Sequence, residues 1–171
     1  MSMKARIVSR KIFVMSIYEQ LVAQSNTFSE SVSDIYDFPL YKDTSLAMTH
    51  MVYMAERFFT NGEKESEDIY DMVDISFLKE MIKGWTQSFP AVIRSVEQHA
   101  TTFSFEKMDP MDKAIFLAGG VEYLIHNTPI KIILNEMIEI AKRYGDTGSA
   151  KLINGIGHKV IEDLSKEENN K

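Results

Sequence analysis

The chain has 171 residues, of which 44% are apolar and 26% are charged, and its formal net charge is -6 at pH 7. These values are typical of a globular protein, and we expect one cytoplasmic domain over residues 1–171 that buries about 70% of its unfolded surface. Cysteine is absent, which excludes disulfides and thiolate metal sites. No apolar run approaches the roughly 18 residues that a membrane span requires, and the N-terminus lacks the apolar block of a signal peptide.

The first predicted helix covers residues 5–24 and begins in a cluster of basic side chains. Residues 1–11 contain four basic residues and no acidic one, and Arg6 and Arg10, four residues apart, share a helix face. Several donors on one face could contact successive phosphates, although composition alone favours a merely solvated helix end. The expected inward positions are Ile7, Phe13 or Val14, Ile17 or Tyr18, and Leu21.

Residues 25–44 are polar and acidic but contain interspersed aromatic side chains. A linker of this length is unusual inside a compact domain, so the aromatics predict a segment that is pinned to the surface, or a short additional helix. They are Phe28, Tyr36, Phe38 and Tyr41. Residues 28–80 hold twelve acidic side chains against four basic ones, which repels RNA and could attract a basic partner. Any RNA footprint must therefore be local, at the N-terminus and beside Lys151 and Lys159.

A helix at residues 45–60 is predicted to bury Met48, Met51 or Val52, Ala55, and Phe58 or Phe59. Met48, Met51 and Met54 recur at helical spacing. Such a stripe is more often core than a soft partner-binding groove, although methionine adapts to irregular surfaces.

Residues 63–74 form an acidic connector to a helix at residues 75–100. Pro90 predicts a kink or a break inside this helix. Trp85 is expected to pack in the core and not to stack on a base. The expected inward side chains are Leu78, Ile82, Trp85, Phe89, Val92 or Ile93, and Val96.

The next helix begins at Asp109-Pro110. Asp109 can cap the helix, Pro110 suits its first position, and Asp112 favours the positive helix end. The pair Gly119-Gly120 should cost about 2 kcal/mol relative to two alanines. We therefore expect a neighbouring helix to pack closely against it.

Two further helices complete the chain. Thr128 can cap the first of them with Pro129 at its first position, and Gly145 can end it in a left-handed conformation. Glu139 can pair with Arg143. The apolar stripe of this helix is Ile130, Ile133, Met137, Ala141 and Tyr144. The pattern as a whole predicts an all-α, compact bundle of about six to seven helices with antiparallel neighbours, followed by a disordered tail at 166–171.

Catalytic motifs are not found in the sequence. His50, His99, His126 and His158 are scattered and are expected to be ordinary histidines, because none belongs to a metal-binding spacing. The run Gly155–Gly157 follows a predicted helix and lacks the third glycine of a dinucleotide fingerprint. We therefore expect no enzymatic activity, cofactor or metal.

The segments Ile133–Gly145 and Ser149–Gly155 together resemble the NusB family of all-helical transcription antitermination factors. The resemblance rests on the Asn135-Glu136 pair, the Lys142–Gly145 closure and the later Asn154-Gly155. Met111–Phe116 and Arg6–Tyr18 are similar to the preceding and the first helix of that family.

The resemblance implies binding of a single-stranded leader RNA element together with the ribosomal protein NusE. The complex would act indirectly on the RNA polymerase elongation complex and favour transcription of ribosomal RNA genes. No membrane partner is implied, and a homodimer is left open. The implied RNA-binding residues are Lys4, Arg6, Arg10, Lys11 and Lys151, while Glu122, Asn135, Glu136 and Asn154 would order helix contacts.

The sequence departs from the family pattern at positions associated with RNA binding. Ile7 and Val8 interrupt the basic run, an arginine is missing in 116–120, and Gly148 and Leu152 replace acidic and aromatic residues. One alternative is therefore a NusB-fold interaction scaffold that has lost RNA recognition. Another is a detached accessory domain of a ribosomal RNA methyltransferase, since this chain has neither a glycine-rich cofactor loop nor a cysteine nucleophile.

Overall fold

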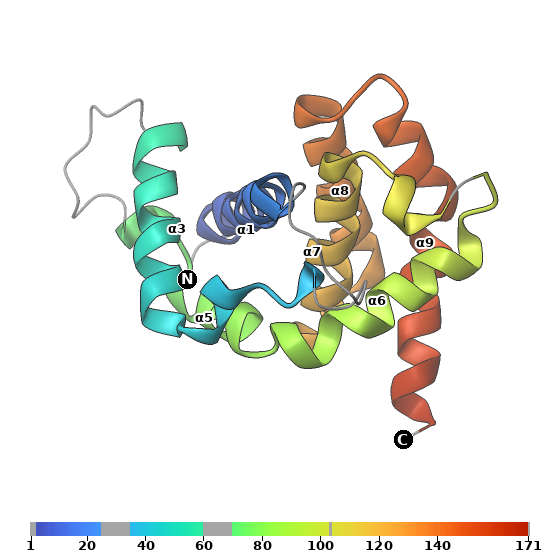
Figure 1. Ribbon diagram of the computed structural model, residues 1–171, viewed down its shortest axis with the longest axis horizontal. Coiled ribbons are helices and arrows are strands. Elements are labelled where there is room, and N and C mark those ends of the chain that lie inside the picture. The colour runs from blue at the N-terminus through green and yellow to red at the C-terminus, as the bar shows by residue number, and fades with distance from the viewer. Residues whose placement is uncertain (1–2, 25–34, 60–69, 103, 171) are drawn as a thin grey trace. The chain divides into compact units, whose positions relative to one another are not determined.

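The computed structural model describes residues 3–24, 35–59, 70–102 and 104–170, and every regular element within these ranges is a helix (Figure 1). This confirms the all-α prediction. No described helix is long and apolar enough to cross a bilayer. The chain divides into two compact units, Met1–Trp85 and Thr86–Lys171. That one domain spans the whole chain stays a prediction.

The N-terminal unit contains α1 (Met3–Gln24), η1 (Pro39–Lys42), α3 (Thr44–Phe59) and α5 (Ile75–Lys83). Helix α1 agrees with the predicted range, and both Phe13 and Val14 are buried in it, as are Ile17 and Leu21. Two predictions about its inner face are corrected: Ile7 is only half-buried, and the alternative Tyr18 is exposed. The reason is that the buried stripe of α1 includes the small residues Ala5, Ser9 and Ser16, which allow neighbouring segments to approach.

Aromatic side chains form the centre of the N-terminal unit. Trp85 is fully buried, stacks on Phe38 with a centroid distance of 5.2 Å, and meets the edge of Phe13 at 5.9 Å. Its indole Nε1 donates a hydrogen bond of 2.6 Å to the carbonyl of Tyr36. Tyr41 completes the cluster, and burial raises the pKa of its hydroxyl. The aromatic residues after position 34 are thus core, not surface attachments, while Phe28 lies outside the described residues.

The interpretation of the α3 methionines as core is confirmed, because Met48, Met51 and Met54 are all buried. Val52 is half-buried. The side chains of Phe58 and Phe59 lie outside the described residues.

The helix predicted at residues 75–100 is two helices, α5 and α6 (Trp85–His99). The break lies at Gly84, whose N–H closes α5 on the carbonyl of Glu80 at 3.0 Å, and not at Pro90, which α6 contains. A glycine adds no side chain to stabilise a continuous helix, so ending one there costs little. The predicted inward positions hold, with Val92 buried and Ile93 half-buried.

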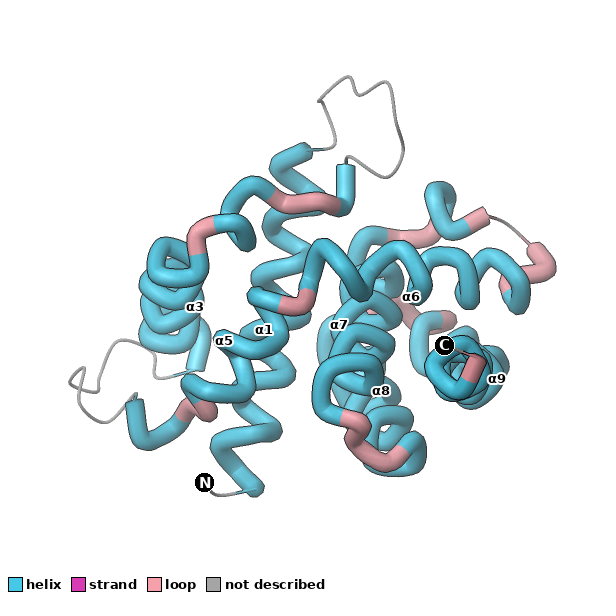
Figure 2. The backbone as a smooth tube through the Cα atoms, turned by 90° about the horizontal axis from the view of Figure 1, so that it is seen from below, coloured by secondary structure: helices cyan, strands magenta, loops and turns pink. Residues whose placement is uncertain are grey.

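The C-terminal unit contains α6, η2 (Phe105–Lys107), α7 (Pro110–His126), α8 (Ile130–Tyr144) and α9 (Ser149–Asn169). Helices α7, α8 and α9 pack on one another, and Figure 2 shows α7 beside α8. Asp109 caps α7 as predicted, since its Oδ1 accepts a 2.9 Å hydrogen bond from the N–H of Met111. Most of the predicted tail is helical here, because α9 continues through Asn169.

Both predicted ends of α8 need correction. Its cap position is Pro129, without a side-chain hydrogen bond, so Thr128 does not cap it. Gly145 is extended (φ -87°, ψ 176°) and not left-handed. A Cβ there would lie 2.6 Å from that of Ser149, so close approach explains this glycine. The left-handed residue is Asn127 (φ 51°), which ends α7.

The surface of α8 also differs from the expected pattern. Glu139 pairs with Lys142, at 3.4 Å, and not with Arg143, which lies over the ring of Tyr144. The predicted stripe is buried at Ile133, Met137 and Ala141, with Ile130 and Tyr144 half-buried and Ile140 buried in addition.

Close helix packing at the glycine pair of α7 is confirmed on two sides. A Cβ on Gly119 would lie 2.5 Å from the sulfur of Met137 in α8. A Cβ on Gly120 would lie 2.5 Å from a methyl group of Val92 in α6. The pair therefore lets α7 approach two neighbours at once.

Candidate nucleic-acid interface

The four basic residues predicted near the N-terminus all lie in the first turns of α1. Lys4 is exposed, and Arg6, Arg10 and Lys11 are half-buried. The structure therefore places these four cations on one helix of the N-terminal unit, as predicted.

Arg6 is held in position by α5. Its Nε donates a 3.0 Å hydrogen bond to Oδ2 of Asp74, and its guanidinium carbon lies 4.4 Å from the ring centroid of Phe77. Arg10 lies over the same ring at 5.9 Å. A guanidinium on an aromatic face is attracted electrostatically by the ring. The side chain of Arg6 is still 35% exposed, and its terminal nitrogens form no hydrogen bond within the described part of the chain.

Asp74 links the start of α5 to α1 through several hydrogen bonds. Its Oδ1 caps α5 by accepting the N–H of Phe77 at 3.1 Å. Its own N–H donates to the hydroxyl of Ser9 at 2.7 Å, and that hydroxyl donates to the carbonyl of Ala5. Each oxygen of this buried carboxylate therefore accepts a hydrogen bond, one from the N–H of Phe77 and one from Arg6.

Asp74 and Phe77 were not predicted as supports of the basic cluster, because residues 63–74 have the composition of a connector. An aspartate just before an apolar run is nevertheless a helix-capping signal. The contact with Arg6 joins residues 68 positions apart, which no local pattern reveals.

The other candidates lie in the C-terminal unit. Lys151 is exposed in the first turn of α9, and Lys159 is exposed further along it. Glu122 is buried in α7, as expected of a residue that orders helix contacts, and Glu136 is half-buried. Asn135 and Asn154 are exposed, and their role in ordering helix contacts stays a prediction.

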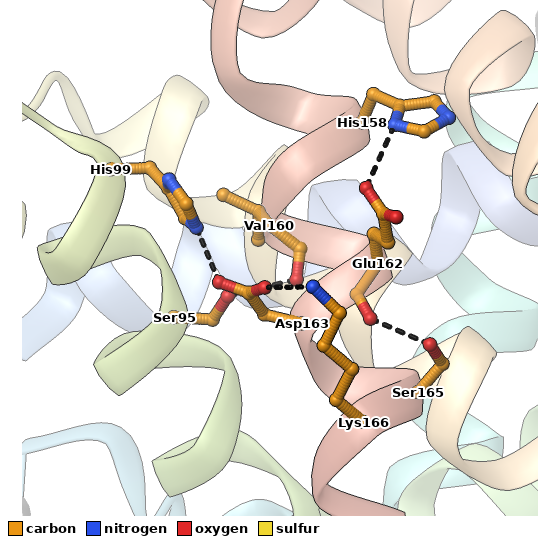
Figure 3. Close-up of polar contacts among 8 residues, drawn as sticks. All are labelled: Ser95, His99, His158, Val160, Glu162, Asp163, Ser165 and Lys166. Carbon is orange, nitrogen blue, oxygen red and sulfur yellow. Dashed lines mark hydrogen bonds and ion pairs between the residues drawn. The ribbon is translucent and has the colours of Figure 1, made fainter.

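His50, His99 and His158 each form an ion pair or a hydrogen bond with a carboxylate. His99 of α6 contacts Asp163 of α9, which also faces Lys166 at 3.7 Å, and Figure 3 shows this group. The hydrogen bond from His99 is the main cause that lowers the pKa of Asp163. His158 contacts Glu162 in the same view, and His50 contacts Glu19.

Ser95 adds a second link between α6 and α9, because its hydroxyl donates to the carbonyl of Val160 at 2.8 Å (Figure 3). Among the described side chains, no three metal-ligating groups gather at one place. The contacts of Ser95 and His99 therefore connect α6 to α9.

Fold and site together define an all-helical protein whose local cationic face lies at the start of its first helix. A model of the NusB family matches residues 43–162, which is well over half of the chain. The chain therefore belongs to the NusB family.

Individual relatives have the same family name. The transcription antitermination protein NusB of Fusobacterium nucleatum is 29% identical over 82 residues, covering 48% of this chain and 54% of that protein. The corresponding protein of Desulfitobacterium hafniense is 33% identical over 95 residues, covering 55% and 64%. A solved structure of T. maritima NusB is 18% identical, with a TM-score of 0.49 and coverage of 92% and 91%. The chain thus matches a little over half to about two thirds of the length of these two curated relatives.

Proposed function

We propose that this chain is a non-enzymatic transcription antitermination factor that binds single-stranded leader RNA together with NusE and supports transcription of ribosomal RNA genes. Family membership supports this proposal, since the relatives above are described as transcription antitermination proteins. The proposal goes beyond family membership by naming the RNA and NusE as ligands. The N-terminal unit has basic and acidic segments that suit these two ligands.

The positioning of Arg6 is the observation that supports RNA binding most directly. Asp74 and Phe77 hold the guanidinium in one place while its terminal nitrogens remain available. A planar fork of donors suits bidentate contact with a phosphate. An arginine that is already ordered loses less conformational entropy on binding than a free surface side chain.

Lys4, Arg10 and Lys11 would extend this contact along α1, and Lys151 would provide another from α9. The acidic composition of residues 28–80 would favour encounter with a basic protein such as a ribosomal subunit protein. RNA affinity in this proposal depends on few charges, because the chain as a whole is acidic.

Salt dependence provides the test. Leader RNA is titrated into the complex with NusE at several salt concentrations. If the four basic residues of α1 contact phosphate, they should contribute about -2.8 to the slope of log affinity against log salt, that is, about -0.7 for each contact.

Charge variants make this test specific to α1. Lys4→Gln with Lys11→Gln should reduce the magnitude of the slope by about 1.4. The matched control, Lys107→Gln with Lys131→Gln, removes the same charge from exposed positions elsewhere and should leave the slope unchanged. Equal slopes for the two double variants would contradict a role for the α1 cluster.

A second candidate function is a NusB-fold scaffold that binds NusE but not RNA. The small basic cluster of α1 against a net charge of -6 favours it. Retention of NusE without salt-sensitive RNA binding would select the scaffold.

A further inference from the structure

A groove of about 420 Å³ lies between α3 and α5 of the N-terminal unit, and we refer to it as the α3–α5 groove. Its volume falls within the range of small-molecule sites. The groove is distinct from the α1 cluster, since none of the four basic residues of α1 lines it. Its polar lining is Thr44, Ser45, Thr49, Tyr70, Lys79 and Lys83.

Two cations line the α3–α5 groove, and neither has a carboxylate partner among the residues that the structure describes. Lys79 and Lys83 are exposed and one turn apart, so they share a face of α5. Within the described part of the chain neither ammonium forms an ion pair, unlike those of Lys42 and Lys166. Among the residues that the structure describes, no acidic side chain lines the groove. This is notable because residues 28–80 hold twelve acidic side chains and four basic ones.

The opposite wall supplies neutral hydrogen-bond donors. Thr44 and Ser45 stand in the first turn of α3, whose N-terminus is capped by Asp43, since Oδ1 of Asp43 accepts a 3.0 Å hydrogen bond from the N–H of Leu46. Their hydroxyls form no hydrogen bond within the described residues. Thr49 follows one turn later and is already bonded to the carbonyl of Ser45, at 3.0 Å. Two ammonium groups and two hydroxyls around one concavity suit a phosphate group.

The remainder of the groove is apolar and is bordered by an aromatic ring. Met48, Val52 and Ile75 contribute the apolar surface. Tyr70 is 56% exposed and lines the same concavity. An exposed tyrosine ring provides a face on which a nucleobase can stack. The site therefore combines a place for a phosphate with a place for a flat ring.

We propose that the α3–α5 groove binds a nucleotide, with Lys79 and Lys83 contacting the phosphate and Tyr70 contacting the base. The nucleotide is either free or part of a single-stranded RNA, because the same chemistry recognises both. The site does not depend on the proposed function, since it uses neither NusE nor the basic residues of α1.

Titration of the full chain with AMP, adenosine and inorganic phosphate tests the proposal. The methyl resonance of Met48, which lines the groove, reports on binding, and that of Met137 in the C-terminal unit serves as a control. AMP should bind at least about tenfold more tightly than adenosine, because a charged hydrogen bond contributes more than a neutral contact. Only Met48 should shift.

Three variants separate the contacts. Lys79→Gln with Lys83→Gln should weaken the binding of AMP by about tenfold or more and leave the affinity for adenosine unchanged. Tyr70→Leu should weaken the binding of AMP but not that of inorganic phosphate. Lys107→Gln with Lys131→Gln, which removes the same charge elsewhere, should change neither.

A single-stranded adenylate hexamer then distinguishes the sources. Tighter binding of the hexamer than of AMP, lost in the Lys79/Lys83 variant, assigns the site to RNA, and weaker binding assigns it to a free nucleotide. The proposal is overturned if AMP and adenosine bind equally, if AMP does not saturably shift Met48, or if both lysine pairs weaken AMP alike. Failure of RNA binding through α1 would leave these results unchanged, so the two proposals fail separately.

Discussion

The two units of this protein each bury an aspartate at a helix start, but the two carboxylates differ in their hydrogen-bond partners. Asp74 of the N-terminal unit has a donor on each oxygen, the N–H of Phe77 and the guanidinium of Arg6. Asp112 of the C-terminal unit is also buried, but its Oδ1 has no hydrogen-bond partner among the described residues. Burial raises the pKa of Asp112, and the nearby Ser149 hydroxyl offsets only part of that effect.

The units also differ in how they pack. The N-terminal unit fills its centre with large rings around Trp85. The C-terminal unit brings helices together over glycine, at Gly119, Gly120 and, against Leu134, at Gly157. A core of large side chains is sensitive to truncation, whereas close helix packing is sensitive to added atoms. The comparison predicts opposite kinds of vulnerability in the two units.

The largest expected effect is the truncation of Trp85. Trp85→Ala should lower the free energy of unfolding by about 3–5 kcal/mol, because it leaves a cavity among Phe13, Phe38 and Tyr41. Urea unfolding measures the change. Tyr53→Ala, at a residue 52% exposed, should cost less than about 0.5 kcal/mol. Similar losses for the two variants would contradict the aromatic core.

Removal of Asp74 should have the next largest effect. Asp74→Ala deletes a helix cap and a charged hydrogen bond to the partly exposed Arg6, for a loss of about 2–3 kcal/mol. Asp109→Ala removes only the cap of α7 and should cost about 1 kcal/mol. If the two substitutions lower the urea midpoint of unfolding by the same amount, the Arg6 contact contributes nothing to stability.

A methyl group added to a glycine should act in opposite directions at two positions. Gly120→Ala gains about 1 kcal/mol of helix propensity but pushes against Val92, which costs about 1–3 kcal/mol, so a net loss of about 1 kcal/mol is expected. Gly155→Ala meets open space in α9 and should stabilise by about 0.5–1 kcal/mol. Thermal unfolding of both variants measures the sign, and a gain at Gly120 would refute the close contact.

The smallest effect is a pH dependence at Asp112. Since its pKa is raised in the folded state, the folded chain holds this proton more tightly than the unfolded chain. The free energy of unfolding therefore falls as pH rises above the ordinary value of 3.8 through the folded-state pKa. Asp112→Asn cannot ionise, so its stability relative to the natural chain should be greater at pH 7 than at about pH 4. Urea unfolding measures this difference in the free energy of unfolding between the variant and the natural chain. A difference that does not change with pH would contradict a raised pKa at Asp112.

The helices and most of their buried faces were predictable because they depend on local spacing. The cap at Asp109 follows from residues within one turn of each other. The inward positions from Leu78 to Val96 follow from the spacing of apolar residues over a turn or two. The break at Gly84 was missed because proline is the stronger signal on a propensity scale, while the location of a break also depends on tertiary packing. The burial of Phe38 and Tyr41 was also missed, because it depends on tertiary packing against Trp85.

The candidate site was predictable only in part. The basic residues of α1 stand close together in sequence and were found, whereas their supports on α5 come from a distant segment. Lys79 and Lys83 were also missed, because their significance depends on the hydroxyls of α3 across the groove. Local patterns reveal which charges are present, and only tertiary structure reveals which of them converge.

The approach of Met137 to Gly119 has an evolutionary consequence. The sulfur of a flexible, unbranched side chain occupies the space that a Cβ at position 119 would need. A shorter residue at 137 would make room for alanine or serine at 119, so relatives should exchange volume between these positions in compensating pairs. Position 120, which faces the branched Val92, should tolerate no such exchange unless 92 itself becomes small.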